Sequence, residues 1–297
     1  MKILITGASG FIGSRLLEEA CHAFGESNVV AFSSKPIDRC ACIVHGSSGD
    51  WNLNEHDAEL IASVETVIHA GAYTPKTSAD ANVIGGCNGN ILFTEKLLGL
   101  RFDSLKKIIY LSTLDVYEQA DLTTESTPTR PATLYGLSKL YCERMISVFA
   151  EQEHIGCHVL RIGHVYGPGE EKYGKFLPKA IRNIIDNAVV ELWGDGSEMR
   201  SFIYIDDVVK SVVNAVGLRE NVGVINVVSG VALSIRQLVE KLALISEKPF
   251  QIVIREFNGP KRDYIFDNKK LKTHLLESET DFDSGLLAEY RYMASLR

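Results

Sequence analysis

The stretch Thr6-Gly7-Ala8-Ser9-Gly10-Phe11-Ile12-Gly13 decides the fold. It follows a short apolar run, Ile3–Thr6, and leads into a run with helical spacing at 14–23. Glycines in such a strand-to-helix turn allow the backbone to approach a pyrophosphate closely, and the helix N–H groups point at its charge. An ordinary glycine-rich turn is the alternative, but strand, glycines and helix in this order favour a dinucleotide site.

Five more apolar runs follow before Tyr166, and longer stretches with helical spacing separate them. The runs span residues 28–32, 42–45, 66–69, 107–111 and 157–162. They are too apolar to alternate between a buried and an exposed face, which indicates a parallel sheet that helices cover on both sides. We therefore expect a doubly wound α/β domain of the Rossmann type.

The pattern of alternating apolar runs and helical stretches ends at Tyr166, where a turn-rich segment begins. A helical stretch at 176–187 follows, and helices are then mixed with apolar runs at 189–193, 201–205, 223–228 and 250–254. We predict that residues 1–166 form the Rossmann domain, to which residues 202–230 partly return. Residues 167–201 and 231–297 then form a smaller α/β domain that binds the substrate.

The amino-acid composition limits which binding partners and which cellular location we expect for this protein. The chain has 297 residues, is 45% hydrophobic and carries a formal net charge of −7, so we expect neither a nucleic acid nor an anionic membrane as partner. The six cysteines show no C-x-x-C pair, which indicates reduced thiols and no metal site. No stretch approaches the roughly 20 apolar residues of a membrane span, and the N-terminal run is too short for a signal peptide. We expect a cytoplasmic protein.

The end of the second predicted strand bears on the choice of dinucleotide. An acidic residue there binds the ribose hydroxyls of NAD, but this chain has Ser33, Ser34 and Lys35, with Arg39 further on. Hydroxyls and a cation accept the 2′-phosphate that a carboxylate repels, which favours NADP. If Lys35 and Arg39 are only solvated loop charges, NAD is the alternative.

A tyrosine and a lysine four residues apart, Tyr135 and Lys139, lie on one face of a predicted helix. A nearby ammonium favours the phenolate, so the pair can act as an acid or a base near neutral pH. Thr113 follows an apolar strand, and the carboxyl ends of strands form the sites of α/β proteins. Thr113, or Ser112 in its place, can bind the reacting oxygen while a nicotinamide exchanges hydride with the same carbon.

The glycine-rich turn, Thr113 and the Tyr135/Lys139 pair together resemble the extended short-chain dehydrogenase/reductase family of nucleotide-sugar epimerases, dehydratases and reductases. The stretches 67–72 and 90–94 resemble further motifs of that family, although the second lacks its usual glycine. Besides the catalytic Thr113, Tyr135 and Lys139, the resemblance implies a dinucleotide site formed by Gly7, Ser9, Gly10, Phe11, Ile12, Gly13, Ser33, Ser34, Lys35, Asp50, Trp51, Ala70, Gly71, Ala72, Asn90, Tyr135, Lys139, Ile162 and Val165.

The resemblance extends into the second half of the chain. Residues 160–168 resemble the segment that leads into the substrate domain, and residues 193–208 resemble the family's C-terminal signature. Arg200 then corresponds to an arginine that grips the substrate's diphosphate, a task that suits a guanidinium fork. Arg262 is a weaker second candidate, with Arg255 as its alternative. The substrate contacts that the resemblance implies are Thr74, Asp115, His164, Phe176, Arg200 and Arg262.

The residue after Thr113 helps to decide which reaction of this family the protein catalyses. Dehydratases of this family carry Thr-Asp-Glu here, whereas this chain has Leu114 and Asp115, so 4,6-dehydration loses its acid and ranks third. We expect reduction at C4 of a nucleotide-linked 4-keto-deoxysugar with NADPH, and the alternative is a nucleotide-sugar 4-epimerase with NAD. A protein that binds the dinucleotide without catalysis stays open as another class. The family often dimerises through the helix that carries Tyr135, so we expect a homodimer.

Overall fold

The computed structural model describes residues 1–46, 51–257, 259 and 261–297, so the predicted cofactor contact Asp50 lies outside the described residues. The central element is a parallel sheet of seven strands in the order β10-β6-β5-β4-β1-β2-β3. Its strands are β1 (Ile3–Thr6), β2 (Val29–Ser33), β3 (Ala41–Val44), β4 (Thr66–His69), β5 (Lys107–Thr113), β6 (Gly156–Ile162) and β10 (Val224–Val227).

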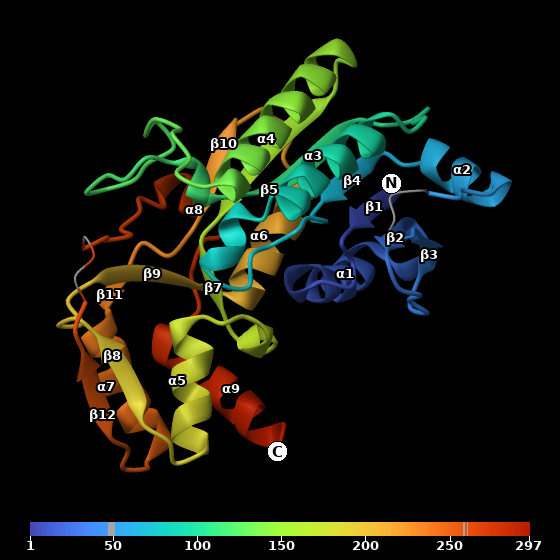
Figure 1. Cartoon of the computed structure of the whole chain (residues 1–297). Coiled ribbons are helices and arrows are strands. Elements are labelled where there is room, and N and C mark those ends of the chain that lie inside the picture. The colour runs from blue at the N-terminus through green and yellow to red at the C-terminus, as the bar shows by residue number, and fades with distance from the viewer. Residues whose placement is uncertain (47–50, 258, 260) are drawn as a thin grey trace.

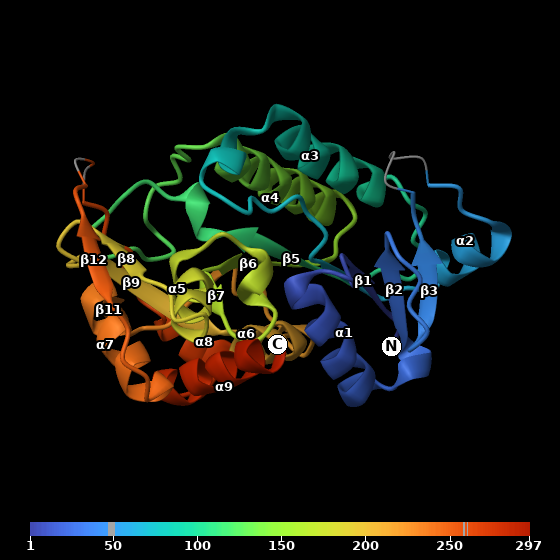
Figure 2. The same ribbon diagram turned by 60° about the horizontal axis from the view of Figure 1, so that its bottom comes forward.

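Helices cover both faces of this sheet, which confirms the doubly wound α/β fold (Figure 1). Figure 2 shows one helical layer above the strands and another below them. One hydrophobic cluster joins the sheet to α1 (Phe11–Phe24), α6 (Ile205–Val216) and α8 (Lys269–His274). A second cluster joins it to α2 (Glu55–Ala62), α3 (Ile84–Leu98) and α4 (Leu134–Gln152). Because both faces are covered, β1, β2 and β4 are buried along their whole length.

The order of the strands reverses next to β1. The chain runs from β1 outward to β2 and β3, and then crosses back so that β4 pairs with β1 on its other side. In α/β sheets, ligands bind at such a reversal, in the crevice outside the carboxyl ends of the strands. Thr6, His69 and Thr113 end β1, β4 and β5 and therefore mark the place of the site.

The remaining elements lie beside the large sheet (lower left of Figure 1). One small sheet contains β7 (His164–Tyr166), β9 (Met199–Tyr204) and β11 (Ala232–Ser234), and another pairs β8 (Val190–Trp193) with β12 (Ile252–Arg255). A third hydrophobic cluster joins α5 (Phe176–Ile185), α7 (Ile235–Ser246) and α9 (Phe282–Ser295). α5 ends two residues earlier than predicted because Asn187 adopts a left-handed conformation, with φ of 56°. The domain boundaries drawn from the sequence stay a prediction.

Within the described ranges, no helix is both long enough and apolar enough to cross a lipid bilayer. The same ranges hold no group of three or more His, Cys, Asp or Glu side chains placed to bind a metal ion. All six cysteines are free thiols.

Candidate active site

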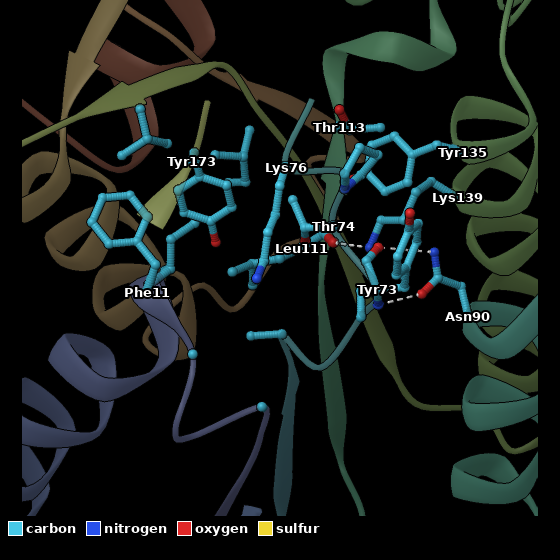
Figure 3. Close-up of a pocket in the computed structure, with 18 of the residues that line it drawn as sticks. Phe11, Tyr73, Thr74, Lys76, Asn90, Leu111, Thr113, Tyr135, Lys139 and Tyr173 are labelled. Atoms are coloured by element: carbon cyan, nitrogen blue, oxygen red, sulfur yellow. Dashed lines mark hydrogen bonds between the residues drawn. The ribbon is translucent and has the colours of Figure 1, made fainter. Parts of the chain in front are cut away.

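A cavity of about 910 Å³ lies at the carboxyl ends of the strands, a volume typical of cofactor and substrate sites (Figure 3). It is lined by most of the predicted site residues: Gly7, Ser9, Gly10, Phe11, Ile12, Gly13, Ser34, Ala70, Gly71, Ala72, Thr74, Asn90, Thr113, Asp115, Tyr135, Lys139, Ile162, His164 and Val165. Six other predicted residues are described by the structure but lie away from the lining: Ser33, Lys35, Trp51, Phe176, Arg200 and Arg262. The structure thus brings the catalytic candidates together with the glycine-rich turn, but not with the two predicted arginines.

The backbone of the glycine-rich turn is packed so closely that side chains at Gly7 and Gly13 would not fit. A Cβ at Gly13 would stand 2.0 Å from the carbonyl oxygen of Gly7, and a Cβ at Gly7, whose φ is +68°, would stand 2.6 Å from the Cα of Gly71. α1 begins at Phe11, three residues before its predicted start, and no side chain of the described residues caps its N-terminus. Its first N–H groups are therefore available to an anion, so this turn fits the diphosphate of a dinucleotide.

The two cations predicted to select NADP lie away from the cavity. Lys35 does not line it, and Arg39 pairs at 3.5 and 3.8 Å with two exposed acidic side chains, Glu18 and Glu26. Ser34 does line the cavity, next along the chain from the buried Ser33. The structure therefore brings a hydroxyl to this end of the cavity, but not the two predicted cations.

Phe93 stands where the family motif usually has glycine, and its ring forms part of the cavity wall. The ring stacks on His69 at 5.5 Å between centroids and meets Trp51 and His45 nearly edge-on at 5.2 and 5.4 Å. Trp51 thus packs against Phe93 and does not reach the lining, whereas His45 does. Sequence reasoning missed Phe93 and His45 as lining residues, and the absent glycine was the one signal available for Phe93.

Asn90 contacts protein with both ends of its side chain. Its Oδ1 accepts a hydrogen bond from the Tyr73 N–H at 2.6 Å. Its Nδ2 donates to the Tyr73 carbonyl at 3.3 Å (Figure 3). The same Nδ2 also donates to Ser138 Oγ at 3.2 Å. Asn90 is only 3% exposed, so its amide ties the backbone after β4 to α3 and α4. Asn90 lines the cavity, and its side chain holds these segments in place.

Tyr135 lies in the first turn of α4, which Thr133 caps by accepting a hydrogen bond from a backbone N–H of that turn. The ring of Tyr135 lies beside Thr113 in the cavity wall (Figure 3). Burial and the Asp115 carboxylate raise the pKa of the Tyr135 phenol, whereas hydrogen bonds to the hydroxyls of Thr113 and Thr74 lower it. A further positive charge is needed to make the phenolate accessible near neutral pH.

Lys139, the lysine that the sequence pairs with Tyr135 for this purpose, lies one turn further along α4. Its Nζ donates to the carbonyl oxygen of Leu111 at 2.6 Å and lies 4.2 Å from the centre of the Tyr110 ring. The side chain is buried, and this burial lowers the pKa of Lys139 to about 8. At neutral pH Lys139 is therefore still cationic, while its ammonium is poised to titrate.

Among the other ionisable side chains that line the cavity are Asp115, His164 and Lys175. Burial raises the pKa of Asp115, and the charge of Lys175 lowers it. Lys175 Nζ lies 2.8 Å from Glu170 Oε1 and donates to the Val165 carbonyl at 3.1 Å. Burial lowers the pKa of His164 to about 3, so this imidazole is neutral, and its Nδ1 has no hydrogen-bond partner among the described residues.

Of the two predicted diphosphate contacts, Arg200 is held by other protein groups and Arg262 is exposed. The Arg200 guanidinium lies 4.8 Å from the ring centre of Tyr264, which does line the cavity, and donates to Glu198 at 2.7 Å. Arg262 is exposed, and its carbonyl oxygen accepts a hydrogen bond from Arg200. Phe176 packs into the third hydrophobic cluster. The substrate-binding roles of these three residues stay predictions.

Two loop segments, residues 73–78 and 172–175, also reach the cavity, and Thr74 is the one residue in them that the sequence analysis had proposed. Gly174 N–H donates to the Lys76 carbonyl oxygen at 2.9 Å and so joins them. Tyr173 places its ring 5.7 Å from that of Phe11, and the Lys76 side chain points into the space between the two loops and the glycine-rich turn (Figure 3). Lys172 lines the same region. Loop residues of this kind have no periodicity by which the sequence could place them.

Comparison with known proteins assigns the chain to a family. The family described as "NAD dependent epimerase/dehydratase family" matches residues 3–227. An uncharacterized UDP-glucose epimerase of Bacillus subtilis is 28% identical, and the match covers 100% of this chain and 99% of the relative. A dTDP-D-glucose 4,6-dehydratase of Dictyostelium discoideum is 28% identical over 71% of this chain, which spans 54% of that protein's length.

Two solved structures resemble the whole chain. UDP-glucuronic acid 4-epimerase from Bacillus cereus, in complex with NAD, has a TM-score of 0.84 and 28% identity, covering 100% of this chain and 97% of that one. MoeE5, in complex with UDP-glucuronic acid and NAD, has a TM-score of 0.85 and 25% identity over 100% of both chains. As the sequence resemblance predicted, this chain belongs to the NAD dependent epimerase/dehydratase family of extended short-chain dehydrogenases/reductases.

Proposed function

We propose that this protein is a nucleotide-sugar 4-epimerase that works with NAD. The observation that carries the proposal is the presence of Thr113, Tyr135 and Lys139 in one cavity with the glycine-rich turn. The full-length likeness to a UDP-glucuronic acid 4-epimerase in complex with NAD supports it. This likeness favours the epimerase, which the sequence analysis kept as its alternative, over the predicted 4-ketoreductase.

The lining residues fit a nicotinamide dinucleotide. The turn from Gly7 to Gly13 and the N-terminus of α1 would hold its diphosphate, and Ser34 would lie at its adenosine end. When bound, the dinucleotide supplies a nicotinamide ring that can take a hydride from a carbinol carbon and return it. Because neither Lys35 nor Arg39 lines the cavity, we propose NAD and not NADP as the cofactor.

The protein's own part is to move a proton at the sugar's C4 hydroxyl. Tyr135, as the phenolate that the Lys139 ammonium favours, accepts the hydroxyl proton, and Thr113 Oγ1 hydrogen-bonds the same oxygen. After the 4-keto sugar has turned its other face, Tyr135 returns the proton to the C4 oxygen.

The residue at position 114 argues against dehydration. Leu114 is 8% exposed and packs with Val116, Tyr117, Val228 and Phe266 in a small apolar cluster. Its hydrocarbon side chain has no acidic proton to donate to a leaving hydroxide. Asp115 keeps a carboxylate at the cavity, but elimination needs an acid as well as a base.

Two assays test the proposal. Purified protein is denatured and the released dinucleotide is identified by chromatography; we expect NAD. Native protein is then incubated with UDP-glucose, UDP-glucuronic acid or dTDP-glucose without added cofactor, and the C4 configuration is read by NMR. Tyr135→Phe should abolish turnover while dinucleotide binding persists. Turnover of a 4-keto-deoxysugar only with added NADPH would restore the reductase, and binding without turnover of any sugar would favour a non-catalytic protein.

We also propose that the protein forms a homodimer through α3 and α4. An open groove on these helices is lined by Leu98, Tyr141, Met145, Val148 and neighbouring residues. Tyr141 and Val148 are 55% and 52% exposed, although both are large and apolar. An apolar surface of this kind on two adjacent helices is suited to an identical pair from a second copy.

A further inference from the structure

A buried polar network lies behind the wall that carries Thr113 and Tyr135. Glu143 follows Lys139 by one turn of α4 and is 4% exposed. Its Oε1 accepts hydrogen bonds from Ser112 Oγ at 2.5 Å and from Arg161 Nε at 3.0 Å, and its Oε2 accepts one from Arg161 Nη2 at 2.7 Å. This carboxylate therefore joins α4 to both β5 and β6 with a bidentate pair.

The network also reaches the far side of the catalytic segment. The Arg161 guanidinium lies 4.6 Å from the ring centre of Tyr117, whose hydroxyl donates to Asn226 Oδ1 at 2.7 Å. Ser112 immediately precedes Thr113, and Tyr117 follows it by four residues. The strand end that presents Thr113 and Asp115 to the cavity is thus held on both sides by groups that meet at Arg161 and Glu143.

A gain in folding stability does not by itself explain why Glu143 and Arg161 form a buried ion pair. Glu143 and Arg161 are each only 6% exposed in their side chains, so both charges have lost nearly all of their hydration. A buried ion pair contributes little net stability compared with apolar side chains of the same volume. What an apolar pair cannot supply is a fixed geometry between α4 and β5, or a negative charge close to Lys139.

Lys139 is surrounded by groups from three elements. Cys142 and Glu143 act on its charge from α4, Tyr110 and the Leu111 carbonyl contact it from β5, and His69 lies within its electrostatic reach from β4. Burial lowers the pKa of His69 to about 3, so this imidazole is neutral near pH 7 and leaves Glu143 as the carboxylate of the set. Burial lowers the pKa of Lys139, and Cys142 and Glu143 oppose that effect.

We infer that Glu143 is a positioning residue for the reaction: it locks the helix of Tyr135 to the strand of Thr113 and keeps the ammonium of Lys139 charged. The inference rests on the proposed function only in taking Tyr135 and Lys139 as the acid–base pair. Removal of the carboxylate would also leave the buried Arg161 cation without its partner, which disfavours a second positive charge at Lys139 still further.

The first test measures Lys139 directly and needs no substrate. Protein labelled with 13C at lysine Cε is titrated by NMR as isolated with its dinucleotide, and Lys139→Met assigns the signal. We expect Glu143→Gln to lower the pKa of Lys139 by about one unit or more, because the neutral amide cannot oppose the loss of hydration. Glu143→Asp, which keeps the charge, should titrate much closer to wild type. An unchanged Lys139 titration in Glu143→Gln overturns the inference even if no sugar is ever turned over.

The second test follows kcat against pH. We expect the alkaline limb of Glu143→Gln to move to lower pH, because Lys139 loses its proton earlier. Asp207→Asn is the matched control: Asp207 is buried at 1% exposure on α6 and accepts from the Thr280 N–H and hydroxyl, so it should lose stability without moving that limb.

A double variant keeps the inference testable if the single variant Glu143→Gln fails to fold. If Glu143→Gln does not fold, Glu143→Leu/Arg161→Met replaces both charges with apolar groups. It should fold and bind dinucleotide but lose about tenfold or more in kcat, since α4 and β5 are no longer locked together. Wild-type kcat in that variant refutes the positioning role.

Discussion

Gly136 packs so closely against Asp115 that a Cβ at Gly136 would stand 2.4 Å from the Asp115 carbonyl oxygen. This contact seats the first turn of α4, with Tyr135, on the segment that follows Thr113. Gly136→Ala should therefore push the turn away, lowering the free energy of unfolding by roughly 1–3 kcal/mol and reducing kcat more than dinucleotide affinity. Denaturant unfolding and kcat measure the two effects. Gly85→Ala in α3, where nothing lies within 4 Å of the added Cβ, is the control and should be neutral or slightly stabilising.

Loss of the Asn90 amide should loosen the segment after β4. Asn90→Ala leaves the N–H and the carbonyl of Tyr73 without these partners, at a cost of roughly 1–3 kcal/mol. We expect dinucleotide affinity to fall by about tenfold, because residues 73–76 line the cavity. Titration calorimetry with NAD gives the measurement. Asn28→Ala removes a similar bond, to the Phe24 carbonyl at the far end of α1, and should leave NAD affinity as it is.

Cofactor choice can be tested at the end of β2. Lys35→Ala should leave the affinities for NAD and NADP unchanged, because Lys35 does not line the cavity. Ser34→Asp should weaken NADP by about tenfold or more while NAD still binds, since a carboxylate repels a 2′-phosphate and can accept hydrogen bonds from ribose hydroxyls. Binding titrations with both dinucleotides decide the matter. A clear loss of NADP affinity in Lys35→Ala would bring back the preference inferred from the sequence.

Stability should fall as the pH rises, through Glu289. Burial and the neighbouring Glu170 raise the pKa of Glu289 from 4.5 to about 9, so the folded protein holds a proton there that the unfolded chain has released. This contribution is complete below about pH 4.5 and is lost as the pH approaches 9. Urea unfolding at several pH values should show this decline, and Glu289→Gln should flatten it. Glu240→Gln, at an exposed position of α7, should keep the wild-type slope.

The proposed dimer depends on the apolar groove over α3 and α4. Val148→Lys places a charge among its lining residues and should convert the dimer to a monomer. Light scattering coupled to size exclusion gives the mass directly. Leu244→Lys, at a site on α7 that is 79% exposed, should leave the mass unchanged. A monomeric wild-type protein at all concentrations contradicts the dimer.

Much of the fold followed from local pattern. The apolar runs at 3–6 and 66–69 coincide with β1 and β4, since a strand buried on both faces needs an unbroken apolar run. Helical spacing placed Tyr135 and Lys139 on one face of α4, and the order of strand, glycines and helix placed the glycine-rich turn between β1 and α1. These features depend on neighbours within a few residues, which is why the sequence alone determined them.

The tertiary structure decided which polar side chains share the cavity. It paired Arg39 with Glu18 and Arg200 with Glu198, which the sequence did not predict. It also brought His45 and Lys175 to the lining and joined Glu143 to Ser112 and Arg161. The partner of a long charged side chain depends on segments distant in the sequence, whose approach is set by the packing of the whole sheet and its helices.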